Sequence, residues 1–164
     1  MEIPVFGKEQ YPLNRESGLS YTISDIYKHV PIHTHTHYEL FIISDGAAYH
    51  MINDSVQTVR KGDLFFIRPN DMHSYNFYHS ENFCVRNLGF STQVLRNVSL
   101  FLEQEEKMDK LINSEMPAYV HLEGENFRKV LDALDTAGKL VNSSHPRHAR
   151  YHAQCVIALL LEDY

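Results

Sequence analysis

The chain has 164 residues, of which 43% are hydrophobic and 22% are charged, and this is the length and composition of one globular domain with a sizeable core. Its 15 basic and 21 acidic residues give a formal net charge of −6, so a broad phosphate-binding surface, and with it direct DNA binding by this chain, is not expected.

The sequence has no pattern of secretion or membrane insertion. Its start, Met1 to Pro4, lacks a basic region followed by an apolar run, and no stretch approaches the ~18 apolar residues of a membrane span. Cys84 and Cys155 are too few for a disulfide framework, and we expect them to be buried free thiols. We therefore predict a cytoplasmic protein with no membrane partner.

Residues 1–18 form the predicted N-terminal arm. This arm contains Phe6 and Tyr11, and it precedes the first expected strand. We expect it either to lie across the mouth of a barrel or to fray as an ordinary chain terminus.

The first half of the chain predicts short strands. Its apolar or alternating runs are rich in β-branched and aromatic residues, lack helical periodicity, and are separated by turn residues such as Asp45-Gly46. The expected strands cover residues 21–24, 40–43, 47–52, 56–59, 64–67, 74–77 and 84–90. Several short strands at this spacing are typical of a sandwich or a barrel.

The segment from His33 to Glu39 carries the main candidates for chemistry. Alternation along a strand would place His33, His35, His37 and Glu39 on one face, and imidazole and carboxylate ligands suit Zn, Ni, Fe or Mn. Residues that follow one another on a strand face lie about 6.6 Å apart, so one ion is not expected to contact all four. The alternative is a polar interior in which the imidazoles hydrogen-bond to one another and to the hydroxyls of a ligand.

The second half changes period near Ser91. Apolar residues at three- and four-residue intervals predict amphipathic helices over about residues 94–102 and 127–141, and a third from about Ser144 to Leu160. Residues 117–122 look extended. We expect the helices from about Phe127 to Leu161 to form a homodimer, because the three leucines at 159–161 offer more apolar surface than one packed face uses.

Two signatures resemble those of the cupin barrels. The first is His33-x-His35-x-x-x-Glu39, followed after six residues by Gly46. The second is met in part, by Gly62, Pro69 and His73, with one extra residue before Pro69 and without the glycine that should follow it.

For the metal-binding cupins, this resemblance implies ligand roles for His33, His35, Glu39 and His73, and thus a divalent transition metal (Zn, Ni, Fe or Mn) as cofactor. A set with His37 in place of His33 stays open, but only the first set has the cupin spacing.

A narrower resemblance begins near Tyr21 and continues to the end of the chain. Four sequence segments carry it: His37-Tyr38-Glu39-Leu40, Lys61-Gly62-Asp63-Leu64 leading to Pro69, His73-Ser74-Tyr75 and Leu88-Gly89-Phe90-Ser91. In this order they resemble the effector-binding domain of transcription regulators of the arabinose-regulator (AraC) family. The family's pair of helix-turn-helix units is not found here, so the resemblance implies DNA contact only through a missing C-terminal domain.

The resemblance implies a mainly β fold with added α-helices: a double-stranded β-barrel (jelly roll) at 19–91, followed by a helical dimerisation segment at 92–164. It also implies a ligand-sensing domain without enzymatic activity. Its small polar effector, with a sugar as the leading class, would bind inside the barrel to His33, His35, His37, Glu39, His73 and Tyr75. The rival interpretations are a small metal-dependent cupin enzyme, either a dioxygenase or an isomerase, and a stand-alone sugar-binding module.

Overall fold

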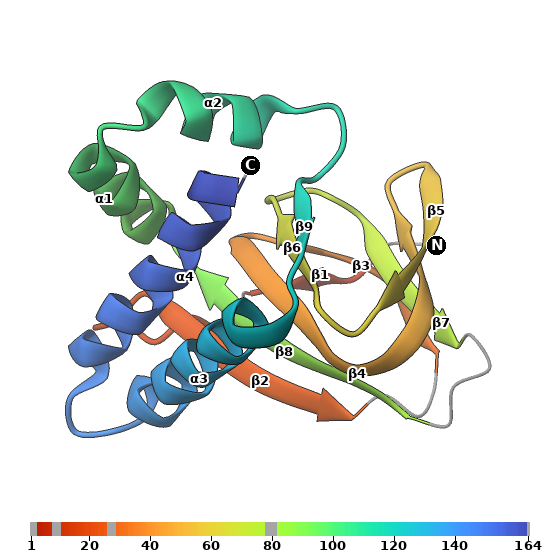
Figure 1. Cartoon of the computed structure of the whole chain (residues 1–164), viewed down its shortest axis with the longest axis horizontal. Helices are drawn as coiled ribbons and strands as arrows, with labels where there is room; N and C mark the ends of the chain where they lie inside the picture. Colours follow the sequence, from red (N-terminus) through yellow and green to blue (C-terminus); the bar gives the residue numbers. More distant parts are fainter. Residues whose placement is uncertain (1–2, 8–10, 26–28, 78–81, 164) are drawn as a thin grey trace.

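The computed structural model describes residues 3–7, 11–25, 29–77 and 82–163. The strands are β1 (Val5–Phe6), β2 (Leu19–Asp25), β3 (Val30–His35), β4 (Tyr38–Ile52), β5 (Ser55–Arg60), β6 (Asp63–Ile67), β7 (His73–Phe77), β8 (Phe83–Phe90) and β9 (Tyr119–His121). The helices are α1 (Thr92–Leu102), α2 (Glu105–Asn113), α3 (Gly124–Val141) and α4 (Ala149–Asp163), with a short 3-10 turn at Pro146–His148. The strands curl into a barrel on one side of the molecule, and the helices gather on the other (Figure 1).

Two sheets form the barrel, and they share β4. The first sheet has the antiparallel order β2-β8-β4-β6-β9. The second has the antiparallel order β3-β7-β4-β5, with β1 added parallel to β3. Residues 38–46 of β4 pair in the first sheet and residues 47–52 in the second, so this one strand joins the two sheets.

The turn predicted at Asp45-Gly46 is wrong, because β4 runs through it as a continuous strand. The register of β4 against β8 shifts between Ile43 and Asp45, and Gly46 has a φ of +79°. Such a bulge bends a strand and changes which residues face inward. The inward residues are odd-numbered before the shift and even-numbered after it: Glu39, Phe41, Ile43, Ala48, His50 and Ile52.

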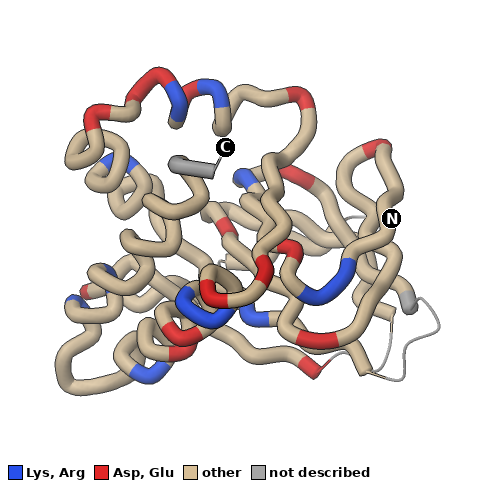
Figure 2. Tube along the Cα trace, in the orientation of Figure 1, with Lys and Arg blue, Asp and Glu red and all other residues tan. Residues whose placement is uncertain are grey.

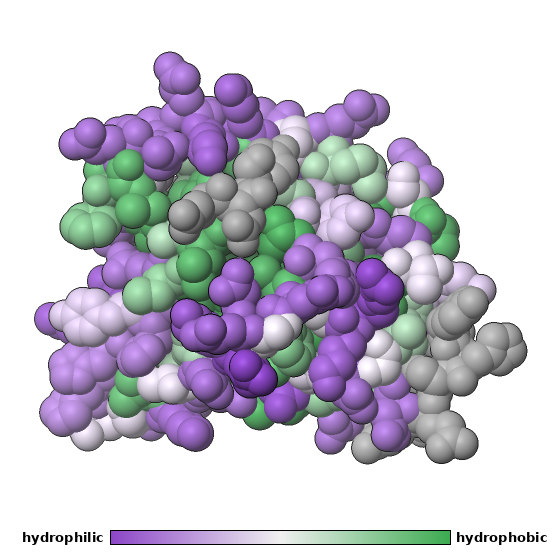
Figure 3. Space-filling view, viewed as in Figure 1, coloured by the Kyte–Doolittle hydropathy of each residue, from purple (hydrophilic) through white to green (hydrophobic). Residues whose placement is uncertain are grey.

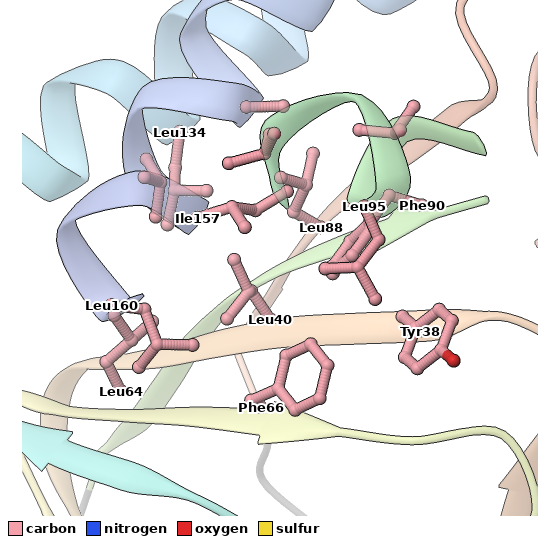
Figure 4. Close-up of a cluster of buried hydrophobic side chains, with 14 of the residues drawn as sticks. Tyr38, Leu40, Leu64, Phe66, Leu88, Phe90, Leu95, Leu134, Ile157 and Leu160 are labelled. Atoms are coloured by element: carbon pink, nitrogen blue, oxygen red, sulfur yellow. The ribbon is translucent and has the colours of Figure 1, made fainter. Parts of the chain in front are cut away.

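The hydrophobic core has two parts, one on each face of the first sheet. The outer part joins the sheet to the helices (Figure 4), through Leu40, Leu64, Phe66, Leu88 and Phe90 on the strands and Leu134, Ile157 and Leu160 on the helices. The inner part fills one end of the barrel with Phe41, Ile43, Phe65, Phe83 and Val85. The other end of the interior is polar and holds the candidate site.

The helical half differs from the prediction in three respects. α2 was not predicted, because Met108 and Leu111 are its only buried residues and give no apolar stripe. Leu160 and Leu161 are buried in the core, so of the three leucines only Leu159 offers surface. Cys155 is exposed rather than buried, although both cysteines are free as expected.

No helix in the described part of the chain is long and apolar enough to cross a membrane. The division into an arm, a barrel and a helical segment stays a prediction. The structure adds that the segment at 92–164 contributes β9, which pairs with β6 at the edge of the first sheet.

Candidate functional site

The predicted site residues meet at the polar end of the barrel. His33 and His35 lie on β3, and His73 lies on β7, directly opposite His33 in the pairing of the two strands. The single strand expected from His33 to Glu39 is interrupted at Thr36-His37, where the chain bends before β4 begins. All four imidazoles, including that of His37, and the Glu39 carboxylate are nevertheless buried together.

Three of these imidazoles form a compact group. Ligand nitrogens of His33, His35 and His73 lie within 4.8 Å of one another. His35 Nε2 lies 2.9 Å from His73 Nε2 and 3.0 Å from Glu39 Oε2, and the same carboxylate oxygen lies 3.7 Å from His73 Nε2. Among the described residues, His37 is not part of this three-nitrogen group, although its ring centroid is 5.3 Å from that of His35.

The group suits a metal ion in its protonation as well as its position. Nδ1 of His33 lies 2.9 Å from the carbonyl oxygen of Pro31, and since a carbonyl only accepts, the His33 proton sits on Nδ1 and its Nε2 presents a lone pair. Burial lowers the pKa of His33 and lowers the pKa of His73 well below its usual value, so both are neutral, as ligands must be. Burial alone would raise the pKa of Glu39, but the neighbouring imidazoles, His35 first and then His33 and His37, outweigh it and lower this pKa, so the carboxylate is ionised. Histidine nitrogens with a carboxylate fit the divalent transition metals.

A cavity of about 190 Å³ opens beside these histidines. Its lining consists of Phe6, Tyr11, Ser20, Thr22, Ser24, Val30, His33, His35, His37, Glu39, Tyr75, Asn87 and Gly89. β1 places Phe6 in the cavity wall by pairing with β3, and the Phe6 ring stacks on His33 with centroids 4.4 Å apart. The predicted arm thus contributes β1, which pairs with β3, and the side chains of Phe6 and Tyr11, which line this cavity.

Sequence reasoning missed the wall that faces the histidines. This wall is built by Ser20, Thr22 and Ser24 on β2, which carry hydroxyl side chains, and by Asn87 on β8. The alternation of small hydroxyl residues at every second position was the available signal, because it marks one face of a strand. Gly89 belongs to the same wall, where a Cβ would lie 2.7 Å from His37 Nε2.

Several polar atoms of the site have no protein partner. Among the described residues, the buried Asn87 Oδ1, Tyr75 Oη and His37 Nδ1 make no hydrogen bond. Burial also raises the pKa of Tyr75 well above its usual value, so its phenol keeps its proton and can donate. Unpaired buried polar groups are costly, and a polar ligand would supply the missing partners.

His50 is a further residue of the site that the sequence did not single out. It is fully buried beneath the three histidines, and its Nε2 lies 3.3 Å from His73 Nδ1. Burial lowers its pKa to about 3, so it is neutral. Simple alternation from Glu39 would have placed this even-numbered residue outside, and only the bulge in β4 turns it inward.

With this geometry in place, comparisons with known proteins show the family. The sequence model of the AraC-like ligand-binding domain matches residues 20–134, and the chain belongs to that family. The HTH-type transcriptional activator RhaS of Klebsiella pneumoniae (strain 342) is 32% identical over 81 residues, which cover 47% of this chain and 28% of RhaS. RhaS of Escherichia coli O81 (strain ED1a) is 31% identical over 80 residues, which cover 46% of this chain and 28% of RhaS. The matched part thus spans less than a third of the length of these activators.

The fold is found in a solved structure as well. Apo ToxT from Vibrio cholerae is similar with a TM-score of 0.65 and 9% identity, over 93% of this chain and 57% of that chain. A cupin protein from Bacteroides fragilis matches with a TM-score of 0.43 and 18% identity, over 46% of this chain and 68% of that chain. The predicted cupin-like barrel followed by helices is confirmed, as is the resemblance to the AraC-family domain.

Proposed function

We propose that this chain is the effector-sensing part of a cytoplasmic transcription regulator, and that it recognises its effector without catalysis. The family membership and the similarity to RhaS support a regulatory role. The observation that carries the proposal is the cavity, whose polar wall atoms lack partners inside the protein. Binding would change regulation only if the effector has different affinities for two states of the molecule.

The cavity wall favours a small, neutral, polyhydroxylated effector such as a monosaccharide. About 190 Å³ is below the ~300 Å³ at which sites for drug-sized ligands begin, so an oligosaccharide would not be enclosed. Hydroxyl and amide groups line one side, and the Phe6 ring offers an apolar face to a sugar ring. In the metal-free cavity, the described lining residues include no Lys or Arg to pair with an anion, and Glu39 would repel one.

A thermal-shift screen of matched pairs tests this proposal. Neutral aldoses are compared with the uronic and aldonic acids derived from them, and the neutral member is expected to raise the melting temperature through linkage. Asn87→Ala should abolish the shift, since it removes the unpaired acceptor Oδ1. Val56→Ala, at an exposed position on β5, is the matched control and should leave the shift unchanged.

The opposite results would replace the proposal. Stabilisation by the acids alone, or by aromatic compounds alone, would exclude a neutral sugar as the effector. Turnover of a stabilising compound in the presence of iron or manganese would show a metal-dependent enzyme of the cupin type instead of a sensor.

We also propose that His33, His35 and His73, with Glu39, hold one divalent transition ion. The support is the set of nitrogens within 4.8 Å of one another and the carboxylate oxygen beside two of them. When bound, such an ion would supply a positive centre for effector oxygens to contact. Elemental analysis of protein purified without a nickel column is expected to find about one ion per chain. Folded wild-type protein that holds no ion and takes up neither Zn nor Ni would refute this site.

The homodimer remains part of the proposal, with a corrected surface. A groove of about 440 Å³ runs between α1 and α4, and its lining includes Phe101, Tyr151 and Cys155. Phe101 is 85% exposed, and Leu159 also reaches the surface. Hydrophobic surface is visible over α1 in Figure 3. A second copy of this chain, packed along α1 and α4, would cover these side chains.

Sedimentation velocity tests the dimer. Wild type is expected to sediment as a dimer at tens of micromolar, and Phe101→Glu as a monomer with an unchanged circular dichroism spectrum. Val56→Glu, at an exposed site on β5, should stay dimeric. A monomeric wild type at this concentration rejects the proposal. A charge at Leu160 would not test the dimer, because the Leu160 side chain lies in the core and Leu160→Glu would unfold the protein.

We propose that DNA is contacted by another part of the regulator. The net charge of this chain is −6, and Lys and Arg are interspersed with acidic residues along the trace without forming a basic stripe in the described part (Figure 2). Sequence-specific retardation of DNA by this chain alone would contradict the proposal.

A further inference from the structure

His50 is set among aromatic rings at the floor of the histidine group. Its ring stacks on Tyr75, with centroids 5.0 Å apart and planes 17° apart, and meets Phe41 and Phe65 edge to face. Among the described residues, its one polar contact is the 3.3 Å approach of its Nε2 to His73 Nδ1, and its own Nδ1 has no partner. A phenyl ring would pack in this place without leaving a buried nitrogen unpaired. The contact with His73 therefore gives a reason for an imidazole rather than a phenyl ring at position 50.

His73 lies between two other imidazoles. Its Nε2 is 2.9 Å from His35 Nε2 and its Nδ1 is 3.3 Å from His50 Nε2. A neutral imidazole carries one N–H and one lone pair, so His73 has a lone pair on Nε2 only when its proton is on Nδ1. The Nδ1–H of His73 then needs an acceptor, and His50 Nε2 is the described side-chain atom within reach; this arrangement places the proton of His50 on its own Nδ1, which lies among aromatic rings without a polar partner.

His33 provides an internal comparison. Its Nδ1 proton is held by the Pro31 carbonyl oxygen at 2.9 Å, which leaves Nε2 free for a ligand. An outer acceptor of this kind fixes the tautomer and the ring orientation of a metal-binding histidine. His33 obtains its acceptor from the backbone of its own strand, whereas His73 has a side chain of β4 in the equivalent place.

We propose that His50 is a positioning residue for the metal site: its Nε2 accepts the Nδ1–H of His73 and thereby directs the lone pair of His73 Nε2 toward His33 and His35. This inference rests on the proposed metal site for its consequence, but the tautomer of His73 can be observed without a metal. The bulge in β4 is what brings His50 into position, since it turns the even-numbered residues inward.

The test combines the tautomer with metal affinity. In metal-free protein, nitrogen-15 NMR of the imidazoles should show His73 with its proton on Nδ1 in wild type and on Nε2 in His50→Phe, which keeps the ring packing and removes the acceptor. Titration with Co²⁺, followed by its absorption bands, should show affinity reduced about 10- to 100-fold in His50→Phe. His50→Gln should recover most of this loss, because its amide oxygen can accept. His29→Phe is the control, since His29 Nδ1 contacts the Tyr75 carbonyl outside the histidine group.

Each outcome decides the proposal. A wild-type His73 with its proton on Nε2 overturns it without any variant. So does a His50→Phe protein that keeps the wild-type tautomer, and so does a His50→Gln protein that binds Co²⁺ as weakly as His50→Phe, which would leave only a packing role. If wild type shows the expected tautomer but binds no Co²⁺, the metal site fails while His50 is still shown to orient His73.

Discussion

The two ends of the barrel interior are built by the same strands and differ completely in chemistry. On β4, Glu39 lies at the polar end and Phe41, two residues later, lies in the inner core. On β8, Asn87 lines the cavity, and Val85 is packed among aromatic rings. One end therefore holds the barrel together by apolar burial, and the other leaves polar atoms unpaired for a ligand. On each of these strands, a residue that stabilises the barrel and a residue that lines the cavity are only two positions apart.

The apolar end should carry the largest effect on stability. Phe41 is fully buried and stacks on Phe65 with centroids 4.8 Å apart. Phe41→Ala is expected to lower the free energy of unfolding by about 3–5 kcal/mol, since it removes apolar burial and leaves a cavity. Urea unfolding measures this change, and a loss under about 1 kcal/mol would show that the inner core is not the main support of the barrel.

A metal ion bound at the polar end should raise the free energy of unfolding of the whole protein. Zinc at a hundred times its dissociation constant is expected to raise the free energy of unfolding of wild type by about 2.7 kcal/mol. His73→Ala should lose most of this gain, and His29→Ala, outside the histidine group, should keep it. Unfolding in buffers with fixed free zinc makes the measurement. An equal gain in both variants would place the zinc elsewhere.

Acid should lower the free energy of unfolding of the metal-free protein through its buried neutral histidines. Burial lowers the pKa of His50 from 6.5 to about 3, so between these values the unfolded chain binds a proton that the folded protein does not. Stability is therefore present above the unfolded pKa and falls as the pH drops, by up to about 1.4 kcal/mol per pH unit for each such histidine. His50→Phe should show a shallower fall than wild type when urea unfolding is followed with EDTA from about pH 7 to about pH 4. Equal slopes would mean that His50 is not held neutral.

The smallest effect on stability is expected for Asn87, whose side-chain oxygen is an unpaired acceptor in the cavity wall. Asn87→Ala should change the free energy of unfolding of the ligand-free protein by less than about 1 kcal/mol, because it also removes a buried acceptor without a partner. The same variant should lose the thermal shift with sugars. A large loss of stability without ligand would show that Asn87 supports the barrel itself, and would erase the contrast between the two ends.

Much of this architecture could be read from the sequence, because alternation and helical periodicity are local signals. The runs at 64–67, 74–77 and 84–90 are strands, and three of the four α-helices follow their apolar stripes. The grouping of His33, His35, Glu39 and His73 agrees with the spacing of the two signatures, although their role as ligands stays a prediction.

The remainder depends on contacts that alternation cannot show. A bulge is a relation between two strands, so the inward turn of His50 was not visible in the sequence of β4 alone. Phe6 belongs to the cavity because β1 pairs with a strand almost thirty residues later. α2 has a largely charged sequence; Met108 and Leu111 join it to the outer core, and the Arg68 guanidinium donates to the Ile112 carbonyl oxygen at its end.

The bulge in β4 also sets how this domain can change in length. Its two halves are out of phase by one residue because the bulge holds one extra residue, so deleting that residue would leave a regular strand with His50 still facing inward. Deleting Ala47, beyond the bulge, would instead exchange the two faces of the second half, sending Tyr49 and Met51 into the barrel and His50 out to solvent. We therefore expect homologues to vary in length at the bulge or at the ends of the strands, and to keep the count from Gly46 to His50 unchanged.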